Sequence, residues 1–308
     1  MESSTPGWES LELRTDDGLM LSGLQVVGPG RQVLLSHGFG QTRQSWTSTQ
    51  RRLRLAGHGS LAMDARGHGR SGRNPPGRPY QADQFVADQV LAARHLGPGP
   101  VLVGASMGGL TGLVAQAQAH SFSALVLVDV TPTWEEAGML RIQAFTGAHA
   151  EGFDDFDQAA DAIAAFLPHR RARKTRAQLE PLLRQDEQGR LRWHWDPRLL
   201  PEFVAGSSGL QEAISQAASA IDVPVLLLSG GRSDLVSDRT IEHFLQRVPH
   251  ARHIRLPQAT HMLAGDDNDA FADAVLEFLR AQSPSTAAGR HAPGPSAVEN
   301  TPVPGVAR

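Results

Sequence analysis

Short apolar runs alternate along the chain with longer segments in which apolar residues recur at helical spacing, and glycines stand between them. The apolar runs are nearly continuous, which is typical of strands covered on both faces. A mostly parallel sheet with crossover helices has this rhythm. Buried strands are predicted at 32–36, 60–63, 101–104, 124–130, 225–229 and 252–256.

A hairpin is predicted before this series. Residues 10–14 and 20–26 are its two strands, and Asp16, Asp17 and Gly18 supply the turn. Helices are predicted among the strands at 46–56, 81–95, 107–119, 239–248 and 269–281. The chain is therefore predicted to have an α/β fold.

The alternation of strand and helix patterns stops between Thr131 and Ile221, where no strand signal is found. Amphipathic helical patterns such as DQAADAIAAFLP dominate there. We interpret 131–220 as a helical lid inserted into a core made of 1–130 and 221–282. The last segment, 283–308, is rich in proline, glycine and small residues and is predicted to be a disordered tail.

Composition narrows the class of protein. The chain has 308 residues with a net charge of -3, which argues against a protein built around nucleic acid. It contains no cysteine, so disulfides, thiolate metal sites and a cysteine nucleophile are excluded. The N-terminus has no basic patch followed by an apolar stretch, and no apolar run is long enough to cross a membrane, so we expect a soluble cytoplasmic protein without membrane contact.

The strongest chemical signal is VLVGASMGGL, in which Gly104, Ser106 and Gly108 form a G-x-S-x-G motif between an apolar strand and a helix. A sharp strand-to-helix turn needs glycine two residues on either side of the serine, and it leaves the serine Oγ exposed at the helix N-terminus. The helix dipole favours negative charge beside that oxygen. Ser106 is therefore a candidate nucleophile.

A serine nucleophile needs a base that a third group orients. Asp234 follows the predicted strand 225–229 and His261 follows the next one, so both fall at the carboxyl edge of the sheet, where catalytic groups gather. Their order along the chain, Ser, Asp, His, is that of enzymes with a nucleophile elbow. Asp129, at the end of LVLVDV, is the alternative acid; we favour Asp234 because GRSD is a polar turn with room to reach a histidine.

The segment LLSHGFGQTRQSW also ends an apolar strand. Acyl transfer develops negative charge on the carbonyl oxygen, and preorganised N–H donors stabilise it. We expect the backbone N–H groups of Phe39 and Met107 to be those donors, whereas His37 and Gly38 shape the loop.

These residues resemble the α/β-hydrolase superfamily. The similarity extends from about Glu9 to Gln282 through HGFG, MDARGHGRSG, GASMGG and the pair Asp234 and His261. It implies a mostly parallel eight-stranded sheet with a helical lid, Ser106 as nucleophile, His261 as general base and then acid, and Asp234 as the group that orients His261. Some members use the position of Asp129 for the acid, and the MDARGHGRSG stretch is chiefly structural in similar proteins.

The lid is expected to set specificity. Trp193, His194 and Trp195 are candidates to wall a pocket for an apolar acyl or aromatic group, although the tryptophans equally fit a role in anchoring the lid. Further candidates adjoin the catalytic segments: Trp46, Trp134 and Met262. A basic run, formed by Arg170, Arg171, Arg173, Lys174 and Arg176, fits either a solvated helix face or attraction of an acidic substrate or carrier.

The favoured function is a serine hydrolase, needing no cofactor or metal, that cleaves a small carboxylic ester, thioester or lactone through an acyl-enzyme. Carbon–carbon hydrolysis and perhydrolase or non-haem haloperoxidase activity are alternatives within the same architecture, and a non-catalytic ligand receptor is a remote one. The rate is expected to rise through one ionisation near pH 6 to 7, where an unperturbed imidazole titrates. Oligomeric state and natural substrate are left open.

Overall fold

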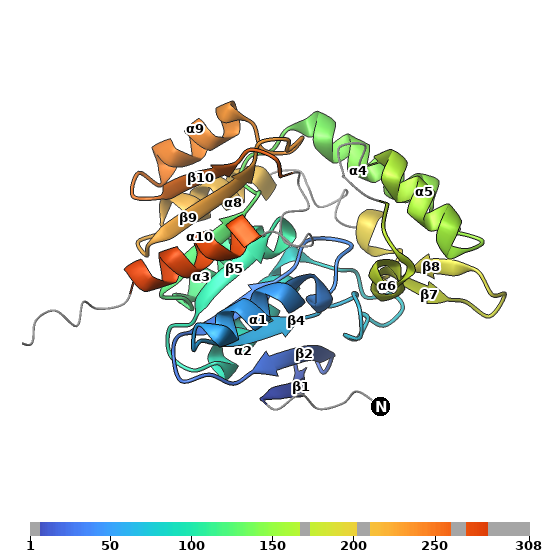
Figure 1. Ribbon diagram of the computed structural model, residues 1–308, viewed down its shortest axis with the longest axis horizontal. Helices are drawn as coiled ribbons and strands as arrows, with labels where there is room; N and C mark the ends of the chain where they lie inside the picture. The colour runs from blue at the N-terminus through green and yellow to red at the C-terminus, as the bar shows by residue number, and fades with distance from the viewer. Residues whose placement is uncertain (1–6, 167–172, 202–209, 260–268, 283–308) are drawn as a thin grey trace, which may run out of the picture.

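The computed structural model describes residues 7–166, 173–201, 210–259 and 269–282, and Figure 1 shows their arrangement. An eight-stranded sheet forms the centre, in the order β1-β2-β4-β3-β5-β6-β9-β10. Only the pairs β1 with β2 and β2 with β4 are antiparallel. The strands are β1 (Trp8–Arg14), β2 (Met20–Val26), β3 (Gln32–Ser36), β4 (Gly59–Met63), β5 (Val101–Ala105), β6 (Ala124–Val128), β9 (Val225–Gly230) and β10 (Arg252–Leu256).

Helices cover both faces of this sheet, and the strand residues divide between them. Leu125 and Leu127 of β6 join the apolar cluster on one face, whereas Val126 between them joins the cluster on the other. Successive side chains of a strand point to opposite faces, which explains why the central strands read as continuous apolar runs. One face carries α2 (Ala82–His95), α3 (Met107–Ala119), α8 (Leu210–Ser219) and α9 (Asp238–Arg247); the other carries α1 (Thr47–Leu55) and α10 (Asp269–Ala281).

The predicted fold class is confirmed, and the predicted core elements match within one or two residues. One difference matters for the site. Strand β6 was expected to reach Val130 but ends at Val128, because Asp129 has a backbone φ of +48°, which a strand does not accommodate.

The segment between β6 and α8, which we call the lid after its predicted role, forms one end of the molecule, to the right in Figure 1. It contains α4 (Glu136–Ala148), α5 (Phe156–Phe166), α6 (Arg176–Leu179), the 3-10 turn η2 (Glu180–Leu182) and a hairpin of β7 (Leu183–Gln185) and β8 (Leu191–Trp193). The expectation of no strands here is wrong. Strands of three residues are too short to show an alternating pattern, and Gly189, at a φ of +83°, supplies their turn.

Helix α8 lies within the stretch interpreted as lid, yet Ile214 and Ala218 are buried in the core cluster beside α3. We therefore propose that the lid ends before this helix, which serves as the crossover from β6 to β9. The predicted disordered tail, 283–308, lies outside the described residues. Within those residues, no helix has both the length and the apolar character needed to cross a membrane.

Candidate active site

Ser106 stands between β5 and α3 in a strained conformation, with φ at +47° and ψ at -117°. Close backbone contacts enforce the turn. A Cβ added at Gly104 would lie 2.7 Å from the carbonyl oxygen of Gly108, and one added at Gly108 would lie 2.5 Å from that of Ser36. The glycine spacing therefore has the steric cause expected for a nucleophile elbow, and the half-buried Ser106 sits at the positive end of α3.

The HGFG loop lies directly beside this serine. A Cβ on Gly38 would be 3.2 Å from the Cβ of Ser106, which is a tight contact, so glycine favours this close approach of the loop. Met107 is the first residue of α3, where backbone N–H groups have no acceptor within the helix. Gly38 and the first residue of α3 therefore lie on either side of Ser106, and the oxyanion role of Phe39 and Met107 stays a prediction.

Two buried histidines support the loop from the core. The Nδ1–H of His37 donates to the Gly38 carbonyl (2.8 Å) and its Nε2 accepts from the Ala65 N–H (2.9 Å). The Nε2 of His68 accepts from the Gly40 N–H (3.2 Å), and its Nδ1–H donates to a carbonyl (3.1 Å). Burial lowers the pKa of both imidazoles, and each ring uses one nitrogen as an acceptor, so both are neutral and structural.

A third histidine reaches the same loop from the lid. His194 is only 1% exposed; its Nδ1 accepts from the Gly69 N–H (2.8 Å) and its Nε2–H donates to the Gly40 carbonyl (3.2 Å). Burial lowers the pKa of His194 to about 4. Both polar groups of Gly40 are therefore held by imidazoles, one from the core and one from the lid. The pattern of the sequence contains no signal for this arrangement.

Of the two candidate acids, Asp129 is fully buried at the end of β6. Its Oδ1 accepts from the Gly230 N–H (2.8 Å) and its Oδ2 from the Ser233 hydroxyl (2.6 Å). The preceding residue, Val128, accepts a hydrogen bond from the Ser106 N–H (3.1 Å). The carboxylate thus lies at the same edge of the sheet as Ser106 and accepts hydrogen bonds from two donors.

Asp234, the acid favoured from the sequence, lies differently. Its side chain is 35% exposed, and its Oδ2 is 2.8 Å from Nη2 of Arg141 in α4. The same helix packs on its backbone, because a Cβ at Gly138 would lie 2.2 Å from the Asp234 carbonyl oxygen. In this structure Asp234 joins the lid to the core through an ion pair.

His261 and Met262 lie outside the described residues. The chain before them ends beside the Asp129 site, because the N–H of Arg232 donates to the carbonyl of Ala259 (3.0 Å). Arg232 precedes Ser233, whose hydroxyl donates to Asp129. In the sequence, His261 follows Ala259 by two residues.

The tryptophans that were predicted to contact substrate lie in different apolar clusters. Trp46 is fully buried in the cluster that contains α10, with its ring 6.1 Å from that of Phe271, which does not favour its predicted contact with substrate. Trp134 packs against the core cluster that contains α3. Trp195 is buried against Phe39, with ring centroids 5.0 Å apart.

Trp193 joins the small apolar core of the lid, where its ring lies 5.1 Å from that of Phe153. It also stacks on Trp195, with ring centroids 6.4 Å apart. The pair therefore connects the apolar core of the lid to the HGFG loop, which favours the anchoring alternative.

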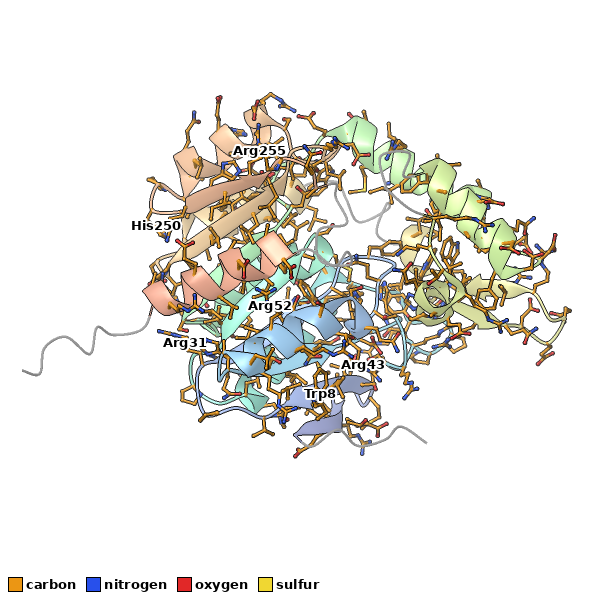
Figure 2. The ribbon with its side chains drawn as sticks, viewed as in Figure 1. Trp8, Arg31, Arg43, Arg52, His250 and Arg255 are labelled. Atoms are coloured by element: carbon orange, nitrogen blue, oxygen red, sulfur yellow. The ribbon has the colours of Figure 1, made fainter. Side chains whose placement is uncertain are left out.

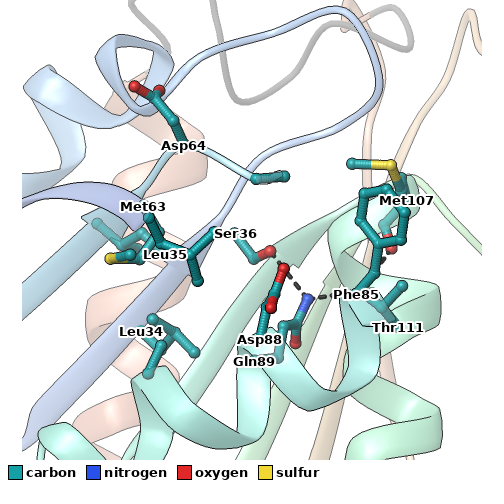
Figure 3. Close-up of a pocket in the computed structure, with 13 residues that line it drawn as sticks. Leu34, Leu35, Ser36, Met63, Asp64, Phe85, Asp88, Gln89, Met107 and Thr111 are labelled. Carbon is teal, nitrogen blue, oxygen red and sulfur yellow. Dashed lines mark hydrogen bonds between the residues drawn. The ribbon is translucent and has the colours of Figure 1, made fainter. Parts of the chain in front are cut away.

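Met107, Ser36 and Gln89 are among the residues that line a small cavity of about 30 Å³ (Figure 3). Gln89 crosses its wall, donating from Nε2 to the Ser36 hydroxyl (2.9 Å) and to the Gly108 carbonyl (2.9 Å). A cavity of this size holds about one water molecule and no substrate. Gln89 thus ties the elbow to the neighbouring strand, and pattern reasoning did not find it. In the described part of the chain, no cluster of three or more His, Asp or Glu side chains forms a metal site.

Comparison with known proteins agrees with this architecture. The model of the alpha/beta hydrolase family matches residues 33–274, most of the chain. The chain belongs to the alpha/beta hydrolase family. It is a hydrolytic enzyme, and the predicted superfamily is confirmed.

Among its relatives, an esterase of Mycobacterium tuberculosis is 29% identical over 268 residues, which cover 84% of this chain and 86% of the esterase. A non-heme haloperoxidase of Rhodococcus erythropolis is 26% identical over 82% of this chain and 93% of its own. The crystal structure of E-2-(acetamidomethylene)succinate hydrolase superposes with a TM-score of 0.77 at 23% identity, covering 89% of this chain and 99% of that one, and shows the shared fold.

Proposed function

We propose that this hydrolase cleaves a carboxylic ester, thioester or lactone through an acyl-enzyme on Ser106. One observation carries the proposal: Ser106 occupies a strained elbow at a helix N-terminus, in contact with the Gly38 loop. Strain at such a position is kept where a reactive group must be presented. The esterase relative supports the same reaction class.

In the proposed reaction His261 removes the proton from the Ser106 hydroxyl as its oxygen attacks the substrate carbonyl. The resulting oxyanion accepts hydrogen bonds from the Phe39 and Met107 N–H groups, each contributing on the order of 3 kcal/mol to the transition state. Collapse expels the alcohol or thiol, which takes the proton from His261. Water, deprotonated by His261, then releases the acid and restores the serine.

Asp129 is proposed as the group that orients His261, in place of Asp234. A triad carboxylate must be desolvated and held by other donors so that it stabilises an imidazolium. Asp129 is buried and accepts hydrogen bonds from Gly230 and Ser233, whereas Asp234 is part-exposed beside Arg141. Asp129 also adjoins the residue that binds the Ser106 backbone.

His194 and His68 are proposed as positioning residues for the oxyanion loop. They bind the carbonyl and the N–H of Gly40, the residue after Phe39. A donor must be held before the oxyanion forms if it is to stabilise charge without reorganisation. The lid therefore contributes to the reaction through His194.

Perhydrolase or haloperoxidase-like activity is the second candidate, because the similarity to the haloperoxidase extends over most of the chain. The same acyl-enzyme would then be attacked by peroxide instead of water. Carbon–carbon hydrolysis uses the same residues and is distinguished by substrate. Family membership with the serine present leaves the receptor alternative without support.

The first experiment tests the nucleophile. A fluorophosphonate probe should add its mass to the Ser106 peptide, and His261→Ala should abolish the labelling. Absence of labelling in the wild type, with the probe active on a control esterase, would overturn the acyl-enzyme proposal.

The second experiment separates the candidate reactions. Values of kcat/KM are compared for p-nitrophenyl esters, a thioester, lactones and a dienone acid, and peracid formation is measured with acetate and peroxide. Esters or thioesters should give the highest values. A higher value for the dienone acid would assign carbon–carbon hydrolysis instead.

A further inference from the structure

The two proposed oxyanion donors belong to segments that are far apart in the sequence. Phe39 follows the end of β3 at Ser36, whereas Met107 is the first residue of α3. The two segments touch, because a Cβ added at Gly108 would lie 2.5 Å from the carbonyl oxygen of Ser36. The spacing of the two donors therefore depends on how the end of β3 is held against the first turn of α3.

One side chain of α2 binds both segments at this contact. Gln89 is only 8% exposed, and Figure 3 shows its amide beside Ser36 and Thr111. Its Nε2 donates to the Ser36 hydroxyl (2.9 Å) and to the Gly108 carbonyl (2.9 Å). A primary amide carries two N–H groups, so both bonds can form at once. Gln89 therefore links the segment of one donor to that of the other.

The orientation of this amide follows from its partners. The Gly108 carbonyl can only accept, so it requires the NH2 group and not the amide oxygen. Nε2 also lies 2.5 Å from Oγ1 of Thr111, whose hydroxyl donates to the Met107 carbonyl (2.9 Å). The network thus reaches the residue that is proposed to supply one of the N–H donors.

A buried ion pair holds α2 in place. Asp88, which precedes Gln89, accepts from Nε and Nη2 of Arg66 (both 2.6 Å), and both side chains are buried. Such a two-bond contact between carboxylate and guanidinium fixes direction as well as distance. The carbonyl of Arg66 in turn accepts from the Nδ1–H of His68, the imidazole that binds the Gly40 N–H. Gln89 therefore acts from a helix whose position is fixed relative to the HGFG loop.

We propose that Gln89 is a positioning residue that sets the spacing of the Phe39 and Met107 N–H groups. The inference rests on the proposed acyl-enzyme and deepens it, because it names the side chain that holds the two oxyanion donors in place. Donors stabilise an oxyanion without reorganisation only where their positions are fixed beforehand. A displacement of about 1 Å can cost on the order of 100-fold in rate. Gln89 acts through the backbone of both segments and needs no contact with the substrate.

Gln50 supplies a matched control. It lies on α1, the helix that carries Arg52 (Figure 2), and is fully buried. Its Nε2 donates to the Leu24 carbonyl (3.0 Å) and to the Ser60 hydroxyl (3.3 Å), which belong to β2 and β4. Within the described residues, the Oε1 atoms of Gln50 and Gln89 both have no hydrogen-bond partner. Replacing either glutamine by methionine therefore removes the same kinds of bond, but only the bonds of Gln89 involve the donor segments.

The first test compares Gln89→Met with Gln50→Met on a p-nitrophenyl ester. Acylation and deacylation both pass through an oxyanion, so Gln89→Met should lower kcat by about tenfold and change KM by less than about twofold. Gln50→Met should keep both values. The thermal midpoints of the two variants should fall by similar amounts, since each variant loses the hydrogen bonds of one buried amide.

A thionoester of the same acid and alcohol separates positioning from a general loss of structure. Sulfur is larger than oxygen and a weaker hydrogen-bond acceptor, so donors spaced for an oxyanion stabilise it less. The ratio of kcat/KM for the ester to that for the thionoester should fall about tenfold in Gln89→Met and stay at the wild-type value in Gln50→Met. The pH dependence of kcat/KM should not change in either variant, because the bonds that are removed do not involve the two groups that donate to Asp129.

A pair of serines repeats the comparison from the other end of the bonds. Ser36→Ala should lower the ratio of ester to thionoester by about threefold, whereas Ser60→Ala should leave it unchanged. In the double variant with Gln89→Met, Ser36→Ala should add no further loss, because the bond between them is already absent. The two serine variants test the proposal even if Gln89→Met does not fold.

Three results for Gln89→Met would each overturn the positioning role: equal losses on ester and thionoester, a loss confined to KM, or a kcat equal to that of the wild type. Equal ratios in Ser36→Ala and Ser60→Ala would overturn it as well. Absence of ester hydrolysis by the wild type, together with absence of fluorophosphonate labelling, would instead overturn the acyl-enzyme on which the inference rests.

Discussion

The core and the lid meet at the catalytic edge of the sheet but are stabilised in different ways. In the core, adjacent residues such as Val126 and Leu127 are fully buried against opposite helix layers. The lid has a small apolar core of its own, and solvent-exposed ion pairs such as Arg173 with Asp157 stabilise its surface. Close packing allows little displacement, so the reactive groups stand on the core.

The lid joins the core through separate polar contacts. Arg141 binds Asp234, Arg184 binds the Gly69 carbonyl, and His194 binds Gly40. Each contact can be removed without a large change in buried apolar area. Because the core is held by close packing and the lid by single polar contacts, we expect substitutions in the core to abolish the reaction. Substitutions in the lid should alter its substrate or its rate.

The largest effect is expected for the nucleophile itself. Ser106→Ala should lower kcat/KM for a p-nitrophenyl ester by roughly 10⁵-fold or more, since the triad acts as a unit. The thermal midpoint should change little, because the serine hydroxyl is not part of the packed core. Circular dichroism checks the fold, and residual activity above one per cent would contradict the assignment.

The next largest effect distinguishes the two acids. Asp129→Asn should lower kcat by roughly 10³- to 10⁴-fold, the loss seen when a triad carboxylate becomes an amide. Asp234→Asn, the matched control, should lower it by less than about tenfold, because it weakens a part-exposed pair with Arg141. The reverse order of the two losses would restore Asp234 as the acid.

Acid should destabilise the junction of lid and core. The pKa of His194 is about 4 when folded, below its usual value of 6.5, so the unfolded chain binds more protons between these pH values. The stability it contributes is complete above pH 6.5 and is lost as pH falls toward 4, by about 3 kcal/mol in all. Urea unfolding at pH 7 and pH 5 measures the change.

His37 and His68 shift in the same direction and add to this slope. His194→Asn should therefore have a shallower pH dependence than the wild type but not a flat one. A variant with an unchanged slope would show that His194 does not titrate in this range.

A smaller effect on rate is expected for the same residue. His194→Leu removes the bond to the Gly40 carbonyl and should lower kcat by about tenfold, since a displaced oxyanion donor loses its alignment. His194→Gln, whose amide can donate to that carbonyl, should recover part of kcat. KM for a neutral ester should change less than kcat, and a change confined to KM would indicate substrate contact instead.

The sequence predicted most helices and strands of the core because the two patterns that identify them, apolar runs and glycine spacing, are local. Continuous apolar runs identified the buried strands, and glycine spacing around Ser106 identified the elbow, whose cause is a steric contact between near neighbours. The hairpin of β7 and β8 was missed because three residues are too few for a period. Trp46 was assigned to the pocket by adjacency to HGFG, although its ring lies in the core beneath α10.

The chain itself therefore determined the α/β architecture, the position of Ser106 and the shape of the loop at Gly38, because each depends on backbone conformation and hydrophobic period over a few residues. Only the tertiary structure decided how Asp129 and Asp234 differ, since burial and hydrogen bonding depend on β9 and α4. The same holds for the hydrogen bond between His194 and Gly40. These features arise from segments that are far apart in the sequence, and no local pattern encodes their contact.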